Sequence, residues 1–316
     1  MNLPVFDLHC DTALALLGDN YRGCGSLLKN DLHIDLERAS GLPAYAQCFA
    51  CFTTSDDAYK AISPVDVFER ELATVMREVE NNSNLIRVAY SASDVARNKD
   101  AGIISAILTI EGPAGFGYDP QLLQDLYAIG FRMTTLGWNE NNPLTGSHVT
   151  GGGLTDLGRE YVREAQRLGM IIDVSHISDK GFWDIAEISQ APIIASHSNS
   201  RAVWDVSRNL TDEMFLHICK TGGVAGINLY TEFLGQKATL DTVCAHILHF
   251  LELDPSGKHI ALGGDLDGCD QLPEGFAGVQ SYPVLAEKLL SWGVDSATIA
   301  DIYWNNAIGV IEKCCT

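Results

Sequence analysis

Short apolar runs alternate with amphipathic segments along the whole chain. Most of these runs are apolar at every position rather than at every second one, which is typical of parallel strands buried on both faces. The pattern predicts eight strands, at residues 5–11, 44–53, 103–112, 131–137, 170–176, 192–198, 223–230 and 259–265.

The amphipathic segments between these runs predict helices. Several begin with Ser, Thr or Asp and several end in Gly, the residues that commonly cap helices. They lie at residues 64–81, 119–130, 154–169, 178–189, 210–222, 239–253, 282–293 and 296–314. Strands that are each followed by helical material predict a (β/α)8 barrel, with an open doubly wound sheet as the alternative. No linker-like segment divides the chain, so we expect one domain over 1–316, with the irregular segment 12–43 covering one mouth of the barrel.

Charge and composition narrow the range of partners. The formal net charge is −20, and a surface this acidic repels nucleic acid and anionic membranes. No window approaches the ~18 uninterrupted apolar residues of a membrane span, and the N-terminus lacks the pattern of a signal peptide. Cys48 and Cys51 form a C-x-x-C inside an apolar run, which favours buried free thiols over a redox motif. We therefore expect a cytoplasmic protein without nucleic-acid or membrane partners.

Ionisable residues stand at the ends of five predicted strands. They are His9 and Asp11, Glu111, His176, His197 and Asp265. The carboxyl ends of barrel strands share one mouth, and residues i and i+2 of a strand point the same way. A single His–Asp pair is equally well explained as a hydrogen bond in a core. Six such groups are costly to bury unless they bind cations or one another.

Three imidazoles and three carboxylates are more ligands than one catalytic zinc ion takes. Two cations bridged by a carboxylate, roughly 3.5 Å apart, fit the set better. Glu111 is the best candidate for the bridge, because it lies between the His9/Asp11 and His176/His197 pairs in strand order. The mixed nitrogen and oxygen donors favour Zn²⁺, with Mn²⁺, Co²⁺ or Fe²⁺ as alternatives.

Six segments together resemble the membrane (renal) dipeptidase family, peptidase family M19 of the amidohydrolase superfamily. They are LHCDTALALL, ILTIEGPAG, IIDVSHIS, PIIASHSNSRAV, VSRNLTDE and IALGGDLDG, and they run from residue 6 to about 268. The resemblance implies a distorted (β/α)8 barrel with two zinc ions per chain. His9 and Asp11 would hold the first ion, His176 and His197 the second, and Glu111 would bridge them.

The resemblance also implies roles for residues around the metals. Asp265 matches the acidic residue beside the bridging water, and Asp267 is interpreted as a supporting residue. Arg208 matches the arginine that binds the C-terminal carboxylate of the substrate, although a surface salt bridge is the alternative. The family's substrate-contacting histidine after the fourth strand is replaced by Trp138. His148, ten residues further on, is either its substitute or a solvated loop histidine.

These residues predict a zinc-dependent dipeptidase that hydrolyses dipeptides, with Asp265 and Glu111 as catalytic residues. The resemblance adds that the family often accepts a D-amino acid at the C-terminal position, and it leaves a homodimer open. The alternative is another binuclear amidohydrolase that acts on lactone, β-lactam or cyclic amide bonds. Such enzymes often use a carboxylated lysine on the fourth strand, and residues 131–137 contain no lysine. A non-enzymatic binder on a decayed barrel would lack a ligand, whereas all six are present.

Overall fold

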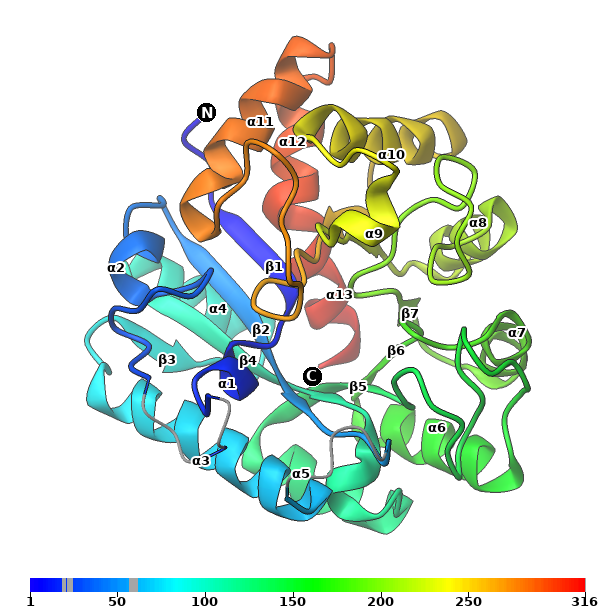
Figure 1. The fold of residues 1–316 in the computed structure, drawn as a ribbon. Coiled ribbons are helices and arrows are strands. Elements are labelled where there is room, and N and C mark those ends of the chain that lie inside the picture. Colours follow the sequence, from blue (N-terminus) through cyan, green and yellow to red (C-terminus); the bar gives the residue numbers. More distant parts are fainter. Residues whose placement is uncertain (19–20, 22–24, 57–61, 316) are drawn as a thin grey trace.

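In the described part of the computed structural model, eight parallel strands form a nearly closed barrel surrounded by helices (Figure 1). The structure describes residues 1–18, 21, 25–56 and 62–315. The strands of the barrel are β1 (Val5–Cys10), β2 (Tyr45–Phe52), β4 (Ile104–Glu111), β5 (Phe131–Thr135), β6 (Ile171–Asp173), β7 (Ile193–Ile194), β8 (Ala225–Ile227) and β9 (Ile260–Leu262). A parallel bridge between Ala195 and Ala225 joins the β7 and β8 edges of the ring. The predicted barrel is confirmed, and the open-sheet alternative is wrong.

Each predicted helical segment contains a helix, and α3 has the predicted bounds, but the helices at 12–15, 36–39, 92–100 and 231–234 lie outside the predicted segments. The α-helices are α1 (Thr12–Ala15), α2 (Leu36–Ala39), α3 (Pro64–Asn81), α4 (Ala92–Asp100), α5 (Leu123–Ile129), α6 (Asp156–Leu168), α7 (Asp179–Ile188), α8 (Asp212–Thr221), α9 (Thr231–Leu234), α10 (Leu240–Leu253), α11 (Tyr282–Ser291), α12 (Ser296–Ala300) and α13 (Asn306–Cys314). Short 3-10 helices lie at η2 (Pro113–Phe116), η3 (Pro120–Leu122) and η4 (Val279–Ser281), and η5 (Asp301–Asn305) is π-helical. The expected caps are present in α6, where the Thr155 side chain accepts from the Gly158 N–H and Gly169 ends the helix in the left-handed region.

The pattern did not predict every element. The strand β3 (Ile86–Val88) pairs with the amino-terminal part of β4. It lies on the same edge of β4 as β5, which pairs with the carboxyl-terminal part of that strand. Three residues are too few to show a clear apolar run. Described parts of the segment 12–43 lie at the carboxyl end of the barrel, as expected: the Thr12 hydroxyl and the His33 N–H both donate to the Asp267 carboxylate at 2.6 Å. The last residues of the segment instead lead into the amino end of β2. Asp267 therefore has the supporting role expected for it.

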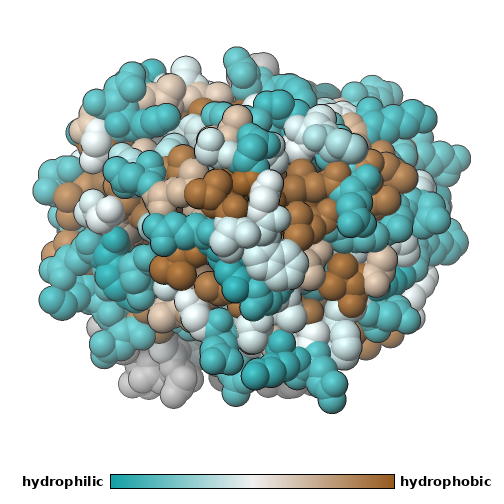
Figure 2. All heavy atoms as spheres, turned by 90° about the horizontal axis from the view of Figure 1, so that it is seen from above, coloured by the Kyte–Doolittle hydropathy of each residue, from teal (hydrophilic) through white to brown (hydrophobic). Residues whose placement is uncertain are grey.

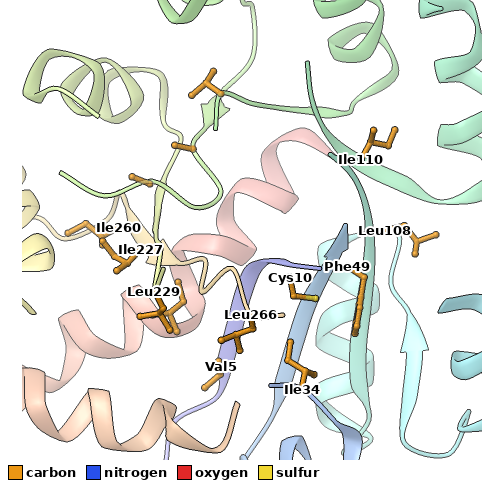
Figure 3. Packing of buried hydrophobic residues seen from close by; sticks show 14 of the residues in the cluster. Val5, Cys10, Ile34, Phe49, Leu108, Ile110, Ile227, Leu229, Ile260 and Leu266 are labelled. Atoms are coloured by element: carbon orange, nitrogen blue, oxygen red, sulfur yellow. The ribbon is translucent and has the colours of Figure 1, made fainter. Parts of the chain in front are cut away.

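Two apolar clusters account for the two buried faces of the strands. The outer cluster joins the strands to the surrounding helices and includes Val5, Cys10, Phe49, Leu108 and Ile110 (Figure 3). The inner cluster joins residues in or next to all eight barrel strands to η5 and α13 at the amino end. Its members include Phe6, Leu8, Ala46, Cys48, Ile107, Met133, Ile171, Ile194, Val224, Ala261, Trp304, Val310 and Ile311. Along β4 the two clusters alternate, so the uniformly apolar run reflects a strand buried on both sides.

The surface carries both polar and apolar side chains. Seen from above, it is mostly polar, with apolar side chains interspersed in small groups (Figure 2). No helix within the described ranges is long and apolar enough to cross a membrane. Cys48 and Cys51 are buried free thiols in β2, as predicted, and Cys24 lies outside the described residues.

Candidate active site

Side chains from five strand ends meet at the carboxyl end of the barrel. His9 Nε2 lies 3.5 Å from Asp11 Oδ2, 3.3 Å from Glu111 Oε2 and 3.9 Å from Asp265 Oδ1. The rings of His9 and His197 stack with their centroids 3.7 Å apart. The structure thus brings together residues that lie up to 256 positions apart, because parallel strands end at the same edge.

A local irregularity in β1 directs His9 toward this cluster. The register between β1 and β2 shifts between Asp7 and Cys10, so three steps along β1 match two along β2. Phe6 and Leu8 belong to the inner cluster, whereas Cys10 belongs to the outer one. A bulge of this kind redirects a side chain, and it allows His9 to face inward directly after Leu8. The i, i+2 argument from the sequence did not include it.

Glu111 lies between the two groups of predicted ligands. Its Oε2 faces His9, while its Oε1 is 3.0 Å from His176 Nε2 and 3.7 Å from His197 Nε2. One carboxylate oxygen on each side is the arrangement expected of a bridging ligand. The residue is the last of β4, and its carboxylate is buried.

The tautomers of two histidines are fixed by their neighbours. The Ser196 hydroxyl donates to Asp173 Oδ2, so its oxygen accepts from His197 Nδ1 at 2.6 Å. His176 Nδ1 lies 2.9 Å from Asn139 Oδ1 and donates to it. Both imidazoles therefore present an unprotonated Nε2 to the cluster. Hydrogen bonds of this kind orient histidines that bind metals.

These donors fit a pair of divalent cations. The Nε2 atoms of His176 and His197 are 3.0 Å apart, and two lone pairs at that separation repel unless a cation lies near both. Two histidines on one tetrahedral zinc ion would be separated by about 3.3 Å, given a zinc–nitrogen distance of about 2.05 Å. His9 Nε2 and Asp11 Oδ1 are buried and have no hydrogen-bond partner among the described residues. Two overlapping clusters have the spacing of metal ligands: His9, Glu111 and His197, and His9, Asp11 and Asp265.

Burial and neighbouring charges displace the pKa values of the clustered groups in both directions. Burial, together with the charges of Asp11 and Asp265, raises the pKa of Glu111 to about 7. Burial and the Asp11 charge raise the pKa of Asp265 to about 6. Burial lowers the pKa of His9, but the Glu111 and Asp11 carboxylates outweigh it and hold that pKa well above its ordinary value. Burial places the pKa values of His176 and His197 well below the ordinary range. A bound cation would stabilise the carboxylates that burial destabilises.

The backbone near the cluster departs from strand geometry. His176 has φ 69° and Asp265 has φ 55°, both in the left-handed region that costs a non-glycine residue on the order of 1–2 kcal/mol. The side chain of Asp265 is oriented by Asn228, whose Nδ2 donates to Asp265 Oδ2 at 3.1 Å and to the His197 carbonyl at 3.2 Å. This leaves Asp265 Oδ1 on the side of His9.

Arg208 is a buried cation beside the cluster. Its guanidinium lies over the Phe233 ring, 5.6 Å from the centroid, and its Nη1 donates to the Ser198 hydroxyl. Nε and Nη2, which together form one bidentate edge, have no hydrogen-bond partner among the described residues. Burial lowers the pKa of Arg208, while the charges of Asp265, Asp173 and Glu111 act to raise it. The surface salt bridge considered for Arg208 is therefore wrong, because the side chain is buried and has no carboxylate partner in the described structure.

A cavity of about 220 Å³ opens onto the cluster. Its walls carry Asp11, Glu111, His176 and Asp265, and its aromatic lining consists of Phe52, Trp138, Tyr230 and Phe233. Trp138 therefore stands where a substrate contact is predicted, with its ring centroid 6.3 Å from that of His176.

His148 lies beside the cavity with both ring nitrogens engaged. Nε2 is 2.9 Å from Asn139 Oδ1, and Nδ1 is 3.0 Å from the Ser207 hydroxyl. Burial and the charges of Arg208 and Arg201 lower the pKa of His148 to about 4. The ring is half-buried, so it is not simply a solvated loop histidine. Its contact with substrate stays a prediction.

Comparison with known proteins agrees with this geometry. The family model of the membrane dipeptidases, peptidase family M19, matches residues 1–315, and this chain belongs to that family. A protein of Schizosaccharomyces pombe named as an uncharacterized dipeptidase is 37% identical over 214 residues, which are 66% of this chain and 52% of that protein. This chain thus aligns with about half the length of that relative.

Solved structures match over nearly the whole chain. A metallopeptidase from Rhodobacter sphaeroides, solved with a phosphinate mimic of L-Ala-D-Ala, has a TM-score of 0.89 and 27% identity, covering 99% of this chain and 100% of its own. A second metallopeptidase, a dipeptidase of family M19, has a TM-score of 0.89 and 28% identity over 100% of this chain and 99% of its own.

Sequence reasoning missed the residues that support the cluster. They are Asp173, Ser196, Asn139 and Asn228. Asp173 and Ser196 interrupt apolar strand runs with polar side chains, and this signal was available. Asn139 and Asn228 lie in loops, and their contacts depend on how those loops fold back over the barrel.

Proposed function

We propose that this protein is a dipeptidase that uses two zinc ions to hydrolyse the peptide bond of free dipeptides. One observation carries the proposal: a bridging-type carboxylate, Glu111, lies among buried imidazoles beside a guanidinium, Arg208, whose bidentate edge is unpaired. His9, Asp11 and Glu111 would hold one ion, and Glu111, His176 and His197 the other. When bound, such a pair of ions lowers the pKa of a water molecule and polarises the scissile carbonyl.

Asp265 is the residue placed to move the proton. Its Oδ1 faces the cluster, while Asn228 holds Oδ2. Asp265 accepts a proton from the attacking water and returns it to the leaving amine as the C–N bond breaks. Such general acid–base catalysis contributes on the order of 10²- to 10⁴-fold to the rate.

Arg208 sets the length and orientation of the substrate. Its free Nε–H and Nη2–H match the two oxygens of a carboxylate, a pairing that adds geometric specificity to charge. A free C-terminal carboxylate at this edge places the preceding peptide bond near the cluster. The cavity of about 220 Å³ suits a small peptide. Neutral lactones lack the carboxylate that Arg208 binds, which favours the dipeptide over that alternative.

A D-amino acid at the C-terminal position is part of the proposal. It is supported by the related Rhodobacter metallopeptidase, whose ligand mimics L-Ala-D-Ala. The test is turnover of zinc-loaded protein on L-Ala-D-Ala, L-Ala-L-Ala, the C-terminal amide of L-Ala-D-Ala, a β-lactam and a lactone. We expect L-Ala-D-Ala to be cleaved fastest and the amide to be a poor substrate. Preferential cleavage of the β-lactam or the lactone would contradict the proposal.

A further inference from the structure

A chain of hydrogen bonds links the Arg208 loop to the metal-facing His176. Ser207, the residue before Arg208, lies 3.0 Å from His148 Nδ1. His148 Nε2 lies 2.9 Å from Asn139 Oδ1, and the same oxygen lies 2.9 Å from His176 Nδ1. The backbone N–H of His148 also donates to the His176 carbonyl at 2.8 Å. Three loops, after β5, β6 and β7, are thus joined through one imidazole.

The protons along this chain can be assigned from one requirement. His176 Nε2 must be unprotonated to face a cation, so His176 carries its proton on Nδ1 and donates to Asn139 Oδ1. An oxygen beside His148 Nε2 also requires a donor, so His148 carries its proton on Nε2. Its Nδ1 then accepts from the Ser207 hydroxyl. Each group has a single consistent role, and Asn139 Oδ1 accepts two hydrogen bonds.

We propose that His148 is a positioning residue that couples the loop carrying Arg208 to the metal ligand His176, through Ser207 and Asn139. The proposal rests on the proposed function for the role of Arg208, and on geometry alone for His148. Both ring nitrogens are used inside the protein, so the ring acts through its neighbours rather than on the substrate. Changes at His148 should therefore have two separable effects, one on cation affinity through His176 and one on binding of the substrate carboxylate through Arg208.

Two conservative variants separate these effects. In His148→Gln the amide nitrogen replaces Nε2–H, so donation to Asn139 is kept and the acceptor for Ser207 is lost. In His148→Asn the amide oxygen replaces Nδ1, so the Ser207 hydrogen bond is kept and the Asn139 hydrogen bond is lost. Removing the partner of a metal-binding histidine typically lowers metal affinity 10- to 100-fold.

The first readout is zinc affinity, measured by competition with a chelator and independent of turnover. We expect His148→Asn to weaken the more labile zinc site about 10-fold or more, and His148→Gln to leave it within about threefold of wild type. The matched control is His249→Asn, at a partly exposed histidine on α10 that pairs with Asp212 and should change nothing. Equal zinc affinity in the two His148 variants would overturn the proposal, whether or not the protein cleaves dipeptides.

The second readout is the separation of KM from kcat on L-Ala-D-Ala. His148→Gln and Ser207→Ala should each raise KM severalfold with kcat little changed, and the double variant should be no worse than either single one. Circular dichroism melting confirms that each variant is folded. Equal losses of kcat/KM in His148→Gln and His148→Asn, with zinc affinity unchanged in both, would show that His148 contacts the substrate directly and would overturn the positioning role. Absence of dipeptide cleavage in the wild type would instead refute the proposed function, leaving the zinc comparison as the test of His148.

Discussion

The two ends of the barrel are built from the same strands but from different side chains. At the amino end, Phe6, Ile107 and Ile171 pack in the inner cluster with Trp304 and α13. Two to four positions further along the same faces, the side chains become polar. Ile107 is followed by Thr109 and Glu111, Ile171 by Asp173 and Ser175, and Ile194 by Ser196. The amino end therefore stabilises the fold, and the carboxyl end holds the chemistry that this stability supports.

The two ends also differ in the ionisable groups that they bury. The amino end is closed by the contact of Phe6 with Trp304, whose ring centroids are 5.7 Å apart, and by the apolar residues of α13. The carboxyl end holds buried carboxylates and imidazoles whose pKa values are displaced in both directions. An unpaired charge would destabilise the apolar amino end. At the carboxyl end, the cations that we propose would neutralise the buried carboxylates.

The largest expected effect is a loss of catalysis without a loss of fold. Asp265→Asn keeps the shape of the side chain and removes its ability to accept a proton. We expect kcat to fall about 10³- to 10⁴-fold, which corresponds to about 4–5.5 kcal/mol on the barrier. Elemental analysis should still find zinc, and the melting temperature should stay near that of wild type. Retained activity would show that the proton is carried by another group.

At the amino end we expect the opposite effect, a loss of stability without a loss of catalysis. Trp304→Ala removes a buried indole from the inner cluster and should lower the free energy of unfolding by about 3–4 kcal/mol. Denaturant unfolding measures this change in free energy, and Trp292→Ala, at an exposed tryptophan, is the control. Below its melting temperature, the folded variant should keep its zinc content and its kcat/KM. If activity per folded molecule falls as well, the two ends are not separable.

A smaller effect is expected at Arg208, whose bidentate edge we propose to bind the carboxylate of the substrate. Arg208→Gln removes the bidentate donor, so kcat/KM for L-Ala-D-Ala should fall about 100-fold, or about 2.7 kcal/mol. The C-terminal amide, a poor substrate already, should be cleaved equally by both proteins. Arg167→Gln, at an exposed arginine paired with Glu164, is the control. Equal losses on the free acid and on the amide would indicate that Arg208 does not bind the carboxylate.

The smallest effect concerns the support of His197. Ser196→Ala removes the acceptor of the His197 Nδ1 proton and should weaken zinc binding about tenfold, or about 1.4 kcal/mol. Chelator competition measures the affinity. Ser105→Ala is the control, since its hydroxyl is similarly buried and accepts from Asn98 Nδ2 near the amino end of β4, away from the cluster. Matching zinc affinities in the two variants would count against the role of Ser196.

Much of this contrast could be predicted from the sequence. The apolar runs predicted all eight barrel strands, because strands buried on both faces leave a continuous signal. Glu111 and the predicted histidines were found because each ends such a run. The runs overstate strand length: 170–176 predicts seven residues, but β6 ends at Asp173, and the chain reaches the left-handed turn at His176.

The remaining features depend on three-dimensional contacts that no local pattern encodes. The bulge before His9 is set by pairing with β2, and the link from Asn139 to His148 requires two loops to meet. The 137–153 loop gave no readable pattern, although it provides Trp138 and Asn139 to the cavity wall. Side-chain hydrogen bonds between loops are fixed by the fold as a whole, so they could be found only in the structure.

The central claim is that two cations lie on either side of Glu111. The most direct test is a crystal structure of zinc-loaded protein with anomalous data collected at the zinc edge. We predict two peaks per chain, one among His9, Asp11 and Glu111 Oε2, and the other among Glu111 Oε1, His176 and His197. A single peak, or peaks away from the Glu111 carboxylate, would contradict the account.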